Sequence, residues 1–301
     1  MNKVFIINLL NITCGLLTVC LWQGCTERMN IKTDNSPPVI VVYGELTDEL
    51  KFQDVMLSRS SPYFDNVPNR GISNAELSVH SSVGDVYRFA ASDSIEGLYR
   101  SVSKFVVAPG LNYSLSIKVD FDNDGALDEY SALTEAFPTV ALDSLKIEAI
   151  DFFGQKNYFL YVYFQAPSDE SYYLFKVYLN DSSVTAKLTD YRIVNDRLFR
   201  GQYTKYSLLR LKDISERERD SEEERERSVY IQANDKIEVR TGVIPSGYFD
   251  FIRQCRQEQD GENPMFGGPA SNITTNINKD GVGYFATYCI SRKSIVFTGS
   301  S

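Results

Sequence analysis

Histidine is nearly absent from the sequence, which has a single one, His80, among 301 residues. Imidazole is the commonest metal ligand and acid–base catalyst of proteins, so this scarcity excludes the helical zinc motif with two histidines. A Ser-His-Asp triad would have to use His80, and the sequence has no Gly-x-Ser-x-Gly nucleophile elbow. His80 ends the alternating segment Ala75–His80, on the opposite face from Leu77 and Val79, so we expect an exposed strand residue.

Basic residues are in deficit, with 31 Lys+Arg against 40 Asp+Glu and a formal net charge of −9. An acidic surface repels phosphate backbones, so we expect no nucleic-acid partner. With 43% hydrophobic residues the chain is globular rather than disordered or collagen-like, and its length suits one large domain or two ordinary ones. The many acidic side chains leave open a pair of catalytic carboxylates, as in glycoside hydrolysis, although no spacing favours a particular pair.

Long apolar runs are absent except at the N-terminus, where Val4 to Leu21 is mostly apolar, which is typical of a secretory signal. The run leads to Gly24-Cys25, and a small residue before a cysteine at this place resembles a bacterial lipobox. The motif implies that residues 1–24 are a lipoprotein signal peptide, that Cys25 carries acyl chains such as palmitate, and that residues 25–38 are a lipidated tether. A plain signal peptide or a signal anchor is the alternative.

Cysteine is scarce, with five in the chain. Cys14 and Cys20 lie inside the apolar run, and Cys25 is assigned to the lipid, which leaves Cys255 and Cys289. In an exported chain these two are permitted to form a disulfide, but sequence spacing does not show that they meet. The alternatives are therefore a disulfide or two buried free thiols.

Short β-type segments separated by polar turns fill residues 39–138 at a spacing of roughly ten residues, which predicts an Ig-like β-sandwich domain. The predicted strands are Val39–Tyr43, Val55–Ser58, Ala75–His80, Val86–Phe89, Leu98–Arg100, Tyr113–Val119 and Tyr130–Leu133.

A second β-rich (α+β) domain is predicted for residues 139–301, so that the fold as a whole is mostly β. Tyr158–Phe164 and Tyr172–Leu179 are predicted to form a hairpin, and both faces of this pair are apolar or aromatic. One short helix near the C-terminus is predicted for Tyr248–Gln259, because Tyr248, Phe251, Ile252 and Cys255 form one buried stripe. Further strands are expected at Tyr203–Leu211 and Val229–Ala233, and closing strands at Gly281–Phe285 and Ser294–Phe297.

The segment from Asp120 to Asp128 resembles a calcium-binding loop. Asp120, Asp122, Asp124 and Asp128 supply oxygens at positions one, three, five and nine, and Gly125 stands at position six. The twelfth position is a serine, so the usual bidentate glutamate is missing. A hairpin turn rich in Asp, Asn and Gly needs no metal, so a calcium site and a metal-free turn are both open.

A charged insertion is predicted at residues 212–228, where nearly every side chain is Lys, Arg, Asp or Glu. Ser221 and Glu224 have capping-box spacing, and Glu223 and Arg227 form a favourable i, i+4 pair. Because the segment has no apolar stripe to bury, we expect an exposed insertion, with a docking arm for a basic partner as the alternative.

Aromatic side chains in loops are candidates for ligand or partner binding, because rings give contact area at low entropic cost. The candidates are Tyr63 and Phe64 in one loop and Phe266 in the segment Asn263–Pro269. Ordinary packing is the alternative for each.

A series of short motifs runs in order through the chain: Pro38–Gly44, Leu57–Phe64, Ile72–Leu77, Gly97–Tyr99, Phe137-Pro138, Asn263-Pro264, Ser271–Ile273 and Gly283–Phe285. With these motifs the chain resembles a family of bacterial surface lipoproteins catalogued as domain of unknown function 4249.

The resemblance implies an outer-membrane lipoprotein exposed on the cell surface, often encoded beside a TonB-dependent receptor of a nutrient-uptake system. It supplies no activity and no catalytic or binding residues. We therefore expect a non-enzymatic, lipid-anchored accessory or ligand-binding component of TonB-dependent nutrient uptake. The alternatives are a surface hydrolase that uses paired carboxylates and a structural envelope or adhesion lipoprotein.

Overall fold

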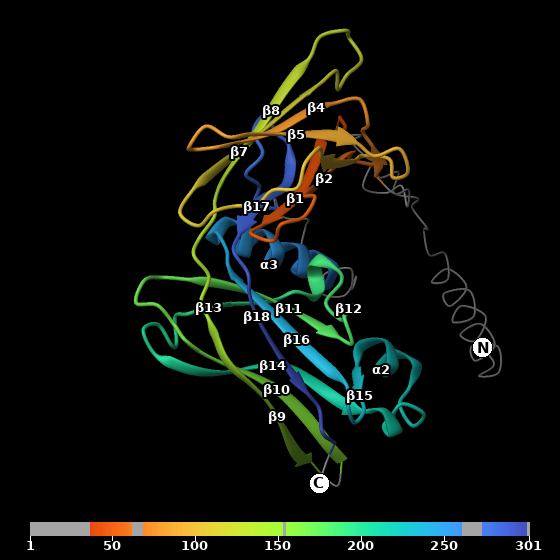
Figure 1. Cartoon of the computed structure of the whole chain (residues 1–301). Coiled ribbons are helices and arrows are strands. Elements are labelled where there is room, and N and C mark those ends of the chain that lie inside the picture. Colours follow the sequence, from red (N-terminus) through yellow and green to blue (C-terminus); the bar gives the residue numbers. More distant parts are fainter. Residues whose placement is uncertain (1–36, 62–68, 153–154, 261–272, 300–301) are drawn as a thin grey trace, which may run out of the picture. The chain divides into compact units, whose positions relative to one another are not determined.

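The computed structural model describes residues 37–61, 69–152, 155–260 and 273–299, and Figure 1 shows the arrangement of their strands and helices. Residues 38–301 form one compact unit, and contacts do not divide the chain at Pro138. The described chain is mostly β, as predicted, and its longest helix is α3 (Ser246–Asp260). Within the described residues no helix is long and apolar enough to cross a membrane.

The N-terminal region is a nine-stranded sheet in the order β17-β1-β2-β6-β5-β4-β7-β8, with β3 paired to β2. Alternate residues of its strands point inward, so Val42, Leu57, Val79 and Leu115 are fully buried in one core. The strands are β1 (Ile40–Thr47), β2 (Asp54–Arg59), β3 (Arg70–Gly71), β4 (Glu76–Ser81), β5 (Val86–Ala91), β6 (Leu98–Ser101), β7 (Asn112–Val119), β8 (Asp128–Glu135) and β17 (Val282–Tyr288).

The side chain of Asn276 bridges the two end strands of this sheet, β8 and β17. The side chain of Asn276 donates to the backbone oxygen of Leu133 in β8 at 3.1 Å and to that of Phe285 in β17 at 2.8 Å. Its Oδ1 also accepts the backbone N–H of Phe285 at 2.9 Å. A sheet whose first and last strands are bridged in this way encloses its core and leaves fewer free backbone groups at its edges.

Strand β17 comes from the far end of the sequence and pairs in parallel with β1. The prediction of a closing strand here is therefore confirmed, but the strand closes the first sheet rather than the second region. The first β region is therefore built from residues near both ends of the sequence.

The second region packs a four-stranded sheet, β15-β14-β10-β9, against a five-stranded one, β12-β11-β16-β18 with β13 beside β11. Phe164 of the first sheet contacts Tyr173 of the second, with ring centroids 5.2 Å apart. The strands are β9 (Leu142–Phe152), β10 (Gln155–Gln165), β11 (Tyr172–Leu179), β12 (Ser182–Ser183), β13 (Arg192–Asn195), β14 (Tyr203–Asp213), β15 (Val229–Ile231), β16 (Lys236–Val243) and β18 (Ser291–Val296).

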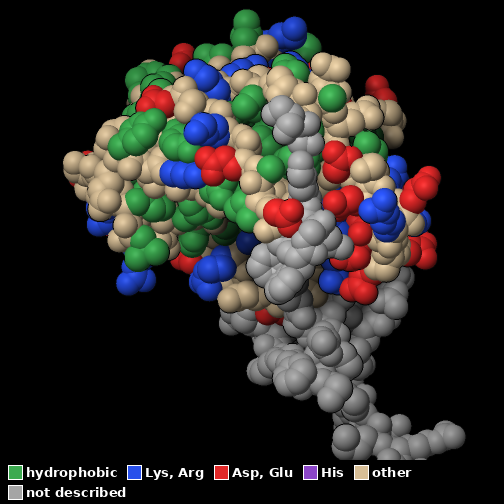
Figure 2. Space-filling view, turned by 90° about the horizontal axis from the view of Figure 1, so that it is seen from below, with side chains coloured by type: hydrophobic (Ala, Val, Ile, Leu, Met, Phe, Trp, Pro, Cys, Tyr) green, Lys and Arg blue, Asp and Glu red, His purple; other side chains and the backbone are tan. Residues whose placement is uncertain are grey.

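The predicted hairpin of Tyr158–Phe164 with Tyr172–Leu179 is wrong. Strand β10 pairs with β9 and β14, whereas β11 pairs with β12, β13 and β16 in the opposite sheet. The connection between β10 and β11 carries the chain across the core, so both strands contribute an apolar face to it. On the other side of β10, Phe159, Tyr161 and Tyr163 are half-buried. Seen from below, the surface of the molecule has hydrophobic side chains among lysines and arginines (Figure 2).

The charged insertion has no buried residue in its two helices, η2 (Ile214–Glu216) and α2 (Glu222–Arg227). Ser221 caps α2 by accepting the backbone N–H of Glu224 at 3.3 Å, as the capping-box spacing predicts. The buried Lys212 at the end of β14 binds Asp220 at 2.7 Å and Glu224 at 3.4 Å. These bonds hold the insertion against the sheet, so it is exposed but attached.

Candidate functional site

The side chains of β1 alternate between two environments. Ile40, Val42 and Leu46 point into the core of the nine-stranded sheet, while Tyr43 and Glu45 point to the other face. Helix α3 and the strands β11 and β17 contribute buried side chains to that face, so Glu45 lies between the two β regions.

Each carboxylate oxygen of Glu45 accepts hydrogen bonds from two donors. Its Oε2 accepts from Lys176 Nζ at 2.7 Å and from the Tyr191 hydroxyl at 3.2 Å. Its Oε1 accepts from the hydroxyls of Tyr248 at 2.6 Å and Tyr288 at 3.3 Å. Four donors converge on one carboxylate of β1, and they come from β11, from the segment after the 3-10 helix η1 (Leu188–Asp190), from α3 and from β17. We call this group the Glu45 hub.

The hub keeps its charges. Burial alone would raise the pKa of Glu45, but the Lys176 charge and the hydroxyl donors hold this pKa below its ordinary value. Burial opposes the charge of Lys176, yet Tyr288 and Glu45 raise the pKa of Lys176 well above its ordinary value. Glu45 and Lys176 therefore remain an ion pair across the physiological pH range.

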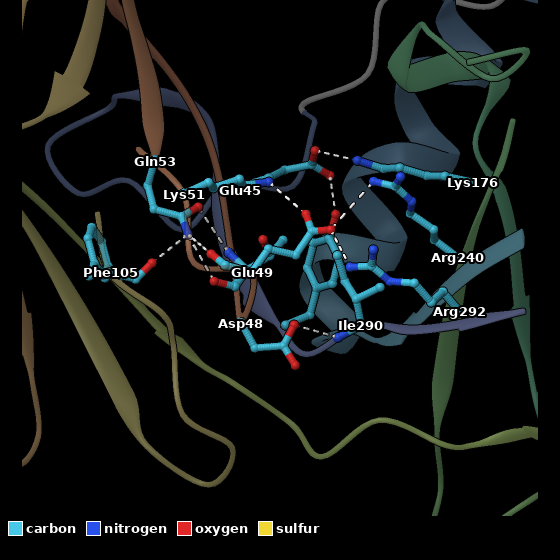
Figure 3. Close-up of polar contacts among 12 residues, drawn as sticks. Glu45, Asp48, Glu49, Lys51, Gln53, Phe105, Lys176, Arg240, Ile290 and Arg292 are labelled. Atoms are coloured by element: carbon cyan, nitrogen blue, oxygen red, sulfur yellow. Dashed lines mark hydrogen bonds and ion pairs between the residues drawn. The ribbon is translucent and has the colours of Figure 1, made fainter. Parts of the chain in front are cut away.

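A second group of charges surrounds Glu49, in the loop after β1 (Figure 3). Its carboxylate accepts from Arg292 at 2.6 Å, from Lys51 at 3.1 Å and from Arg240 at 3.5 Å. Burial raises the pKa of Glu49, and the nearby Lys51, Arg240 and Arg292 more than offset it, so the pKa is lowered. The loop itself is held by Gln53, whose amide nitrogen donates to backbone oxygens of Thr47, Glu49 and Phe105.

A cavity of about 80 Å³ lies between these two groups of charges. Its lining includes Glu45, Glu49, Lys51, Lys176 and Arg240, together with the apolar Leu174 and Ile290. We treat this junction cavity as the candidate binding site, because charged and apolar side chains converge on one concave, partly open space.

The aspartate loop is the second candidate site. Carboxylate oxygens of Asp120, Asp122 and Asp124 lie within 4.8 Å of one another, whereas Asp128 instead accepts the backbone N–H of Phe121 at 3.4 Å. Backbone N–H groups of the loop already donate to Asp120, Asp122 and Asp124, as in a metal-free turn. One buried oxygen of Asp120 has no hydrogen-bond partner among the described residues, which suits a cation ligand.

Calcium is expected to raise the melting temperature, with a dissociation constant on the order of 0.1–1 mM. Asp122→Asn and Asp124→Asn should abolish this shift, because each removes a charged ligand from the three-aspartate group. Asp128→Asn is the matched control and should retain most of it. Thermal unfolding with added calcium or magnesium measures the effect, and an unchanged wild-type midpoint would show a metal-free turn.

Several predicted residues lie outside the described part of the chain, namely Cys25, Tyr63, Phe64 and Phe266. Cys255 and Cys289 are free cysteines in the structure. Of the two alternatives, a disulfide or two free thiols, the structure therefore has the free thiols. Burial raises the pKa of each thiol to about 11. His80 is exposed and shares a 3.0 Å contact with Ser78, as expected for an outward strand residue.

The Glu45 hub was not predicted from the sequence. A signal was available, since Glu45 and Lys176 are single charges within otherwise apolar or aromatic strand segments. Such a charge is rarely left in a buried strand without a partner of opposite sign. Which partner it meets depends on the contact between two regions 131 positions apart in sequence.

A family model described as "Domain of unknown function (DUF4249)" matches residues 26–294. The chain belongs to the DUF4249 family. No curated protein matches this DUF4249 chain.

Among solved structures, the DUF4249 chain is similar to a Salmonella alpha-2-macroglobulin mutant, with 14% identity over 70% of this chain and 14% of that one, at a TM-score of 0.23. It is also similar to a chain of a cytokine receptor complex, with 9% identity over 87% of this chain and 98% of that one, at a TM-score of 0.23. A DUF4785 family protein from Legionella pneumophila has 8% identity over 70% of this chain and 54% of that one, at a TM-score of 0.25.

Proposed function

We propose that this DUF4249 protein is a lipid-anchored protein of the outer-membrane surface, a non-catalytic accessory or ligand-binding component of TonB-dependent nutrient uptake. The observation that carries the binding part is the junction cavity, which is lined by the charged side chains of Glu45, Glu49, Lys51, Lys176 and Arg240. Fixed charges recognise a ligand by its own charge.

The lipid anchor rests on the sequence. An apolar run leads to Gly24-Cys25, and the polar residues that follow lead directly to β1 at Ile40. Two or more acyl chains on Cys25 would hold the protein durably at a membrane. A tether of residues 25–38 spans at most about 50 Å when fully extended, so the body would stay close to the lipid surface.

A surface hydrolase with paired carboxylates is the alternative. Such an enzyme needs one carboxyl group with a raised pKa to serve as the general acid. The two carboxylates that line the junction cavity, Glu45 and Glu49, both have lowered pKa values. The cavity therefore favours recognition of charge over proton transfer.

Replacing Cys25 with serine is expected to abolish incorporation of radiolabelled palmitate and to move the protein from the membrane fraction to the soluble fraction. The serine has no thiol to receive the diacylglyceryl group. Cys20→Ser is the matched control, because Cys20 lies inside the apolar run, and it should label and sediment like the wild type. Membrane sedimentation of an unlabelled Cys25→Ser protein would point to a signal anchor and contradict the lipid proposal.

The partner proposal predicts that a tagged copy, purified in mild detergent, brings an outer-membrane β-barrel receptor with it. Mass spectrometry of the purified material identifies the partner, and the Cys25→Ser protein should recover much less of it because it leaves the membrane. Repeated recovery of the wild-type protein without any transporter would argue for the envelope or adhesion alternative.

A further inference from the structure

The junction cavity has an excess of positive charge in a chain that is acidic overall. Lys51, Lys176 and Arg240 line it against two carboxylates, Glu45 and Glu49, whereas the whole chain carries −9. Lys176 and Glu45 neutralise each other at 2.7 Å, so the excess lies on the side of Lys51 and Arg240. A local cationic site in an acidic protein attracts a small anion in preference to a cation.

Arg240 is held in position and still has donors to give. Its Nε donates to Glu238 at 2.6 Å, and its guanidinium lies 4.2 Å from the ring centroid of Tyr178. Its Nη1 reaches Glu49 only at 3.5 Å, which is long for a hydrogen bond, and its Nη2 has no acceptor among the described residues. A planar donor group that is already oriented loses little entropy when it binds a carboxylate or phosphate.

One buried hydroxyl in the same lining has no partner within the described residues. Thr47 is 3% exposed, it lies on the face of β1 that carries Glu45, and no described group accepts from or donates to its side-chain oxygen. Buried hydroxyls are nearly always paired, so an unpaired one beside a cavity indicates that the contents of the cavity supply the missing bond.

The size of the cavity limits those contents. A cavity needs a volume of about 10–15 Å³ to hold one water molecule, so a cavity of about 80 Å³ holds a few waters or one small polyatomic group. Leu174 and Ile290 close part of the wall with apolar surface, which suits the carbon end of a carboxylate or the ester end of a phosphate.

We propose that the junction cavity binds a small oxyanion group, a carboxylate or a phosphate, through Arg240, Lys51 and the hydroxyl of Thr47. The inference rests on the binding part of the proposed function and is independent of the lipid anchor. The Glu45 hub forms the fixed wall of the site, and Glu49 remains the partner of Arg292.

Isothermal titration of the purified full-length lipoprotein in detergent with sodium acetate and, separately, sodium phosphate tests this proposal. We expect one of the two anions to bind with a dissociation constant below about 1 mM, while sodium chloride at equal ionic strength gives no saturable signal. The arm that binds identifies the oxyanion class. No saturable heat with either anion, or weak binding that chloride reproduces, would mean an adventitious ion only and overturn the proposal.

Two kinds of variant locate the binding. Arg240→Gln should weaken it at least about tenfold, as should Lys51→Gln to a smaller degree, because each removes a charged donor. Thr47→Val keeps the shape of the side chain, so it should leave the melting temperature of the ligand-free protein equal or higher and still weaken binding severalfold.

Arg253→Gln on α3 is the control and should bind like the wild type, because Arg253 bonds to Asp250 away from the cavity. Equal affinity in all four variants would place the anion elsewhere and contradict the assignment. Palmitate labelling is unaffected by these outcomes, so a failed titration leaves the anchor proposal standing and removes only the oxyanion site.

Discussion

Replacing Lys176 with methionine is expected to destabilise the protein by about 3 kcal/mol or more, because it leaves the Glu45 carboxylate buried without its counter-charge. The side chains of Lys176 and Glu45 are only 18% and 13% exposed, so water does not replace the lost partner well. Methionine keeps most of the length and volume of lysine, so the loss reports charge more than packing. Urea unfolding of the purified protein measures the change in the free energy of unfolding.

A double-mutant cycle separates the ion pair from the rest of the hub. Glu45→Gln alone leaves Lys176 unpaired and should also destabilise, whereas the double variant with Lys176→Met buries no net charge and should recover a large part of the loss. Arg100→Met, which breaks the exposed pair with Asp54 at 2.7 Å, is the control and should hardly move the urea midpoint. Additive effects of the two hub variants would show that no coupled pair exists.

The pH dependence should reverse between the wild type and Lys176→Met. In the wild type the pKa of Glu45 is lower in the folded state, so its stabilising effect is present above the unfolded pKa of about 4.3 and is lost at more acidic pH. In Lys176→Met, burial without a counter-charge raises the folded pKa of Glu45 instead. That variant should therefore gain stability relative to the wild type as the pH falls from 7 toward 5.

Much of the secondary structure could be predicted from the sequence because its causes are local. The alternating segments Ala75–His80 and Tyr113–Val119 fall in β4 and β7, and the stripe of Tyr248 and Ile252 falls on α3 with both side chains fully buried. Period-two and period-3.6 patterns record which face of an element is buried.

Pairing between strands was less predictable, because it depends on the path of the chain rather than on the pattern. Two apolar strands joined by a short polar segment, such as β10 and β11, are compatible with a hairpin or with a crossing between facing sheets. Both arrangements bury one face of each strand. Strand β16 was not predicted, although it carries a period-two pattern: Ile237 and Val239 are buried, while Glu238 and Arg240 lie on the opposite face.

The two candidate sites also differ in how far the sequence predicts them. The aspartate loop was predictable because its ligands are close in sequence, and the structure does bring Asp120, Asp122 and Asp124 together. The junction cavity was not predictable, because its walls come from β1, β11 and β16, which meet only in the folded protein. The charge of Glu45 in a buried strand was a feature of the sequence that indicated a contact with a partner of opposite charge.

Replacing Gly283 with alanine is expected to destabilise the protein by about 3–5 kcal/mol, from backbone strain and steric overlap together. Gly283 lies in β17 opposite Val42 of β1, with φ at 101°, in the region that side chains disfavour. A Cβ atom there would lie 2.0 Å from the backbone oxygen of Val42. The urea midpoint measures the loss, and the anion affinity should fall with it, because β17 also carries Tyr288 to the hub.

Gly84 provides a control with the same backbone angle. Its φ is 100°, but a Cβ atom at that turn would meet nothing within 4 Å, so Gly84→Ala adds strain without overlap and should cost only about 1–2 kcal/mol. The difference between the two variants therefore isolates the close approach of β17 to β1. Equal losses would mean that β17 moves away from β1 without penalty, and then the parallel pair could not be what holds Tyr288 and α3 over Glu45.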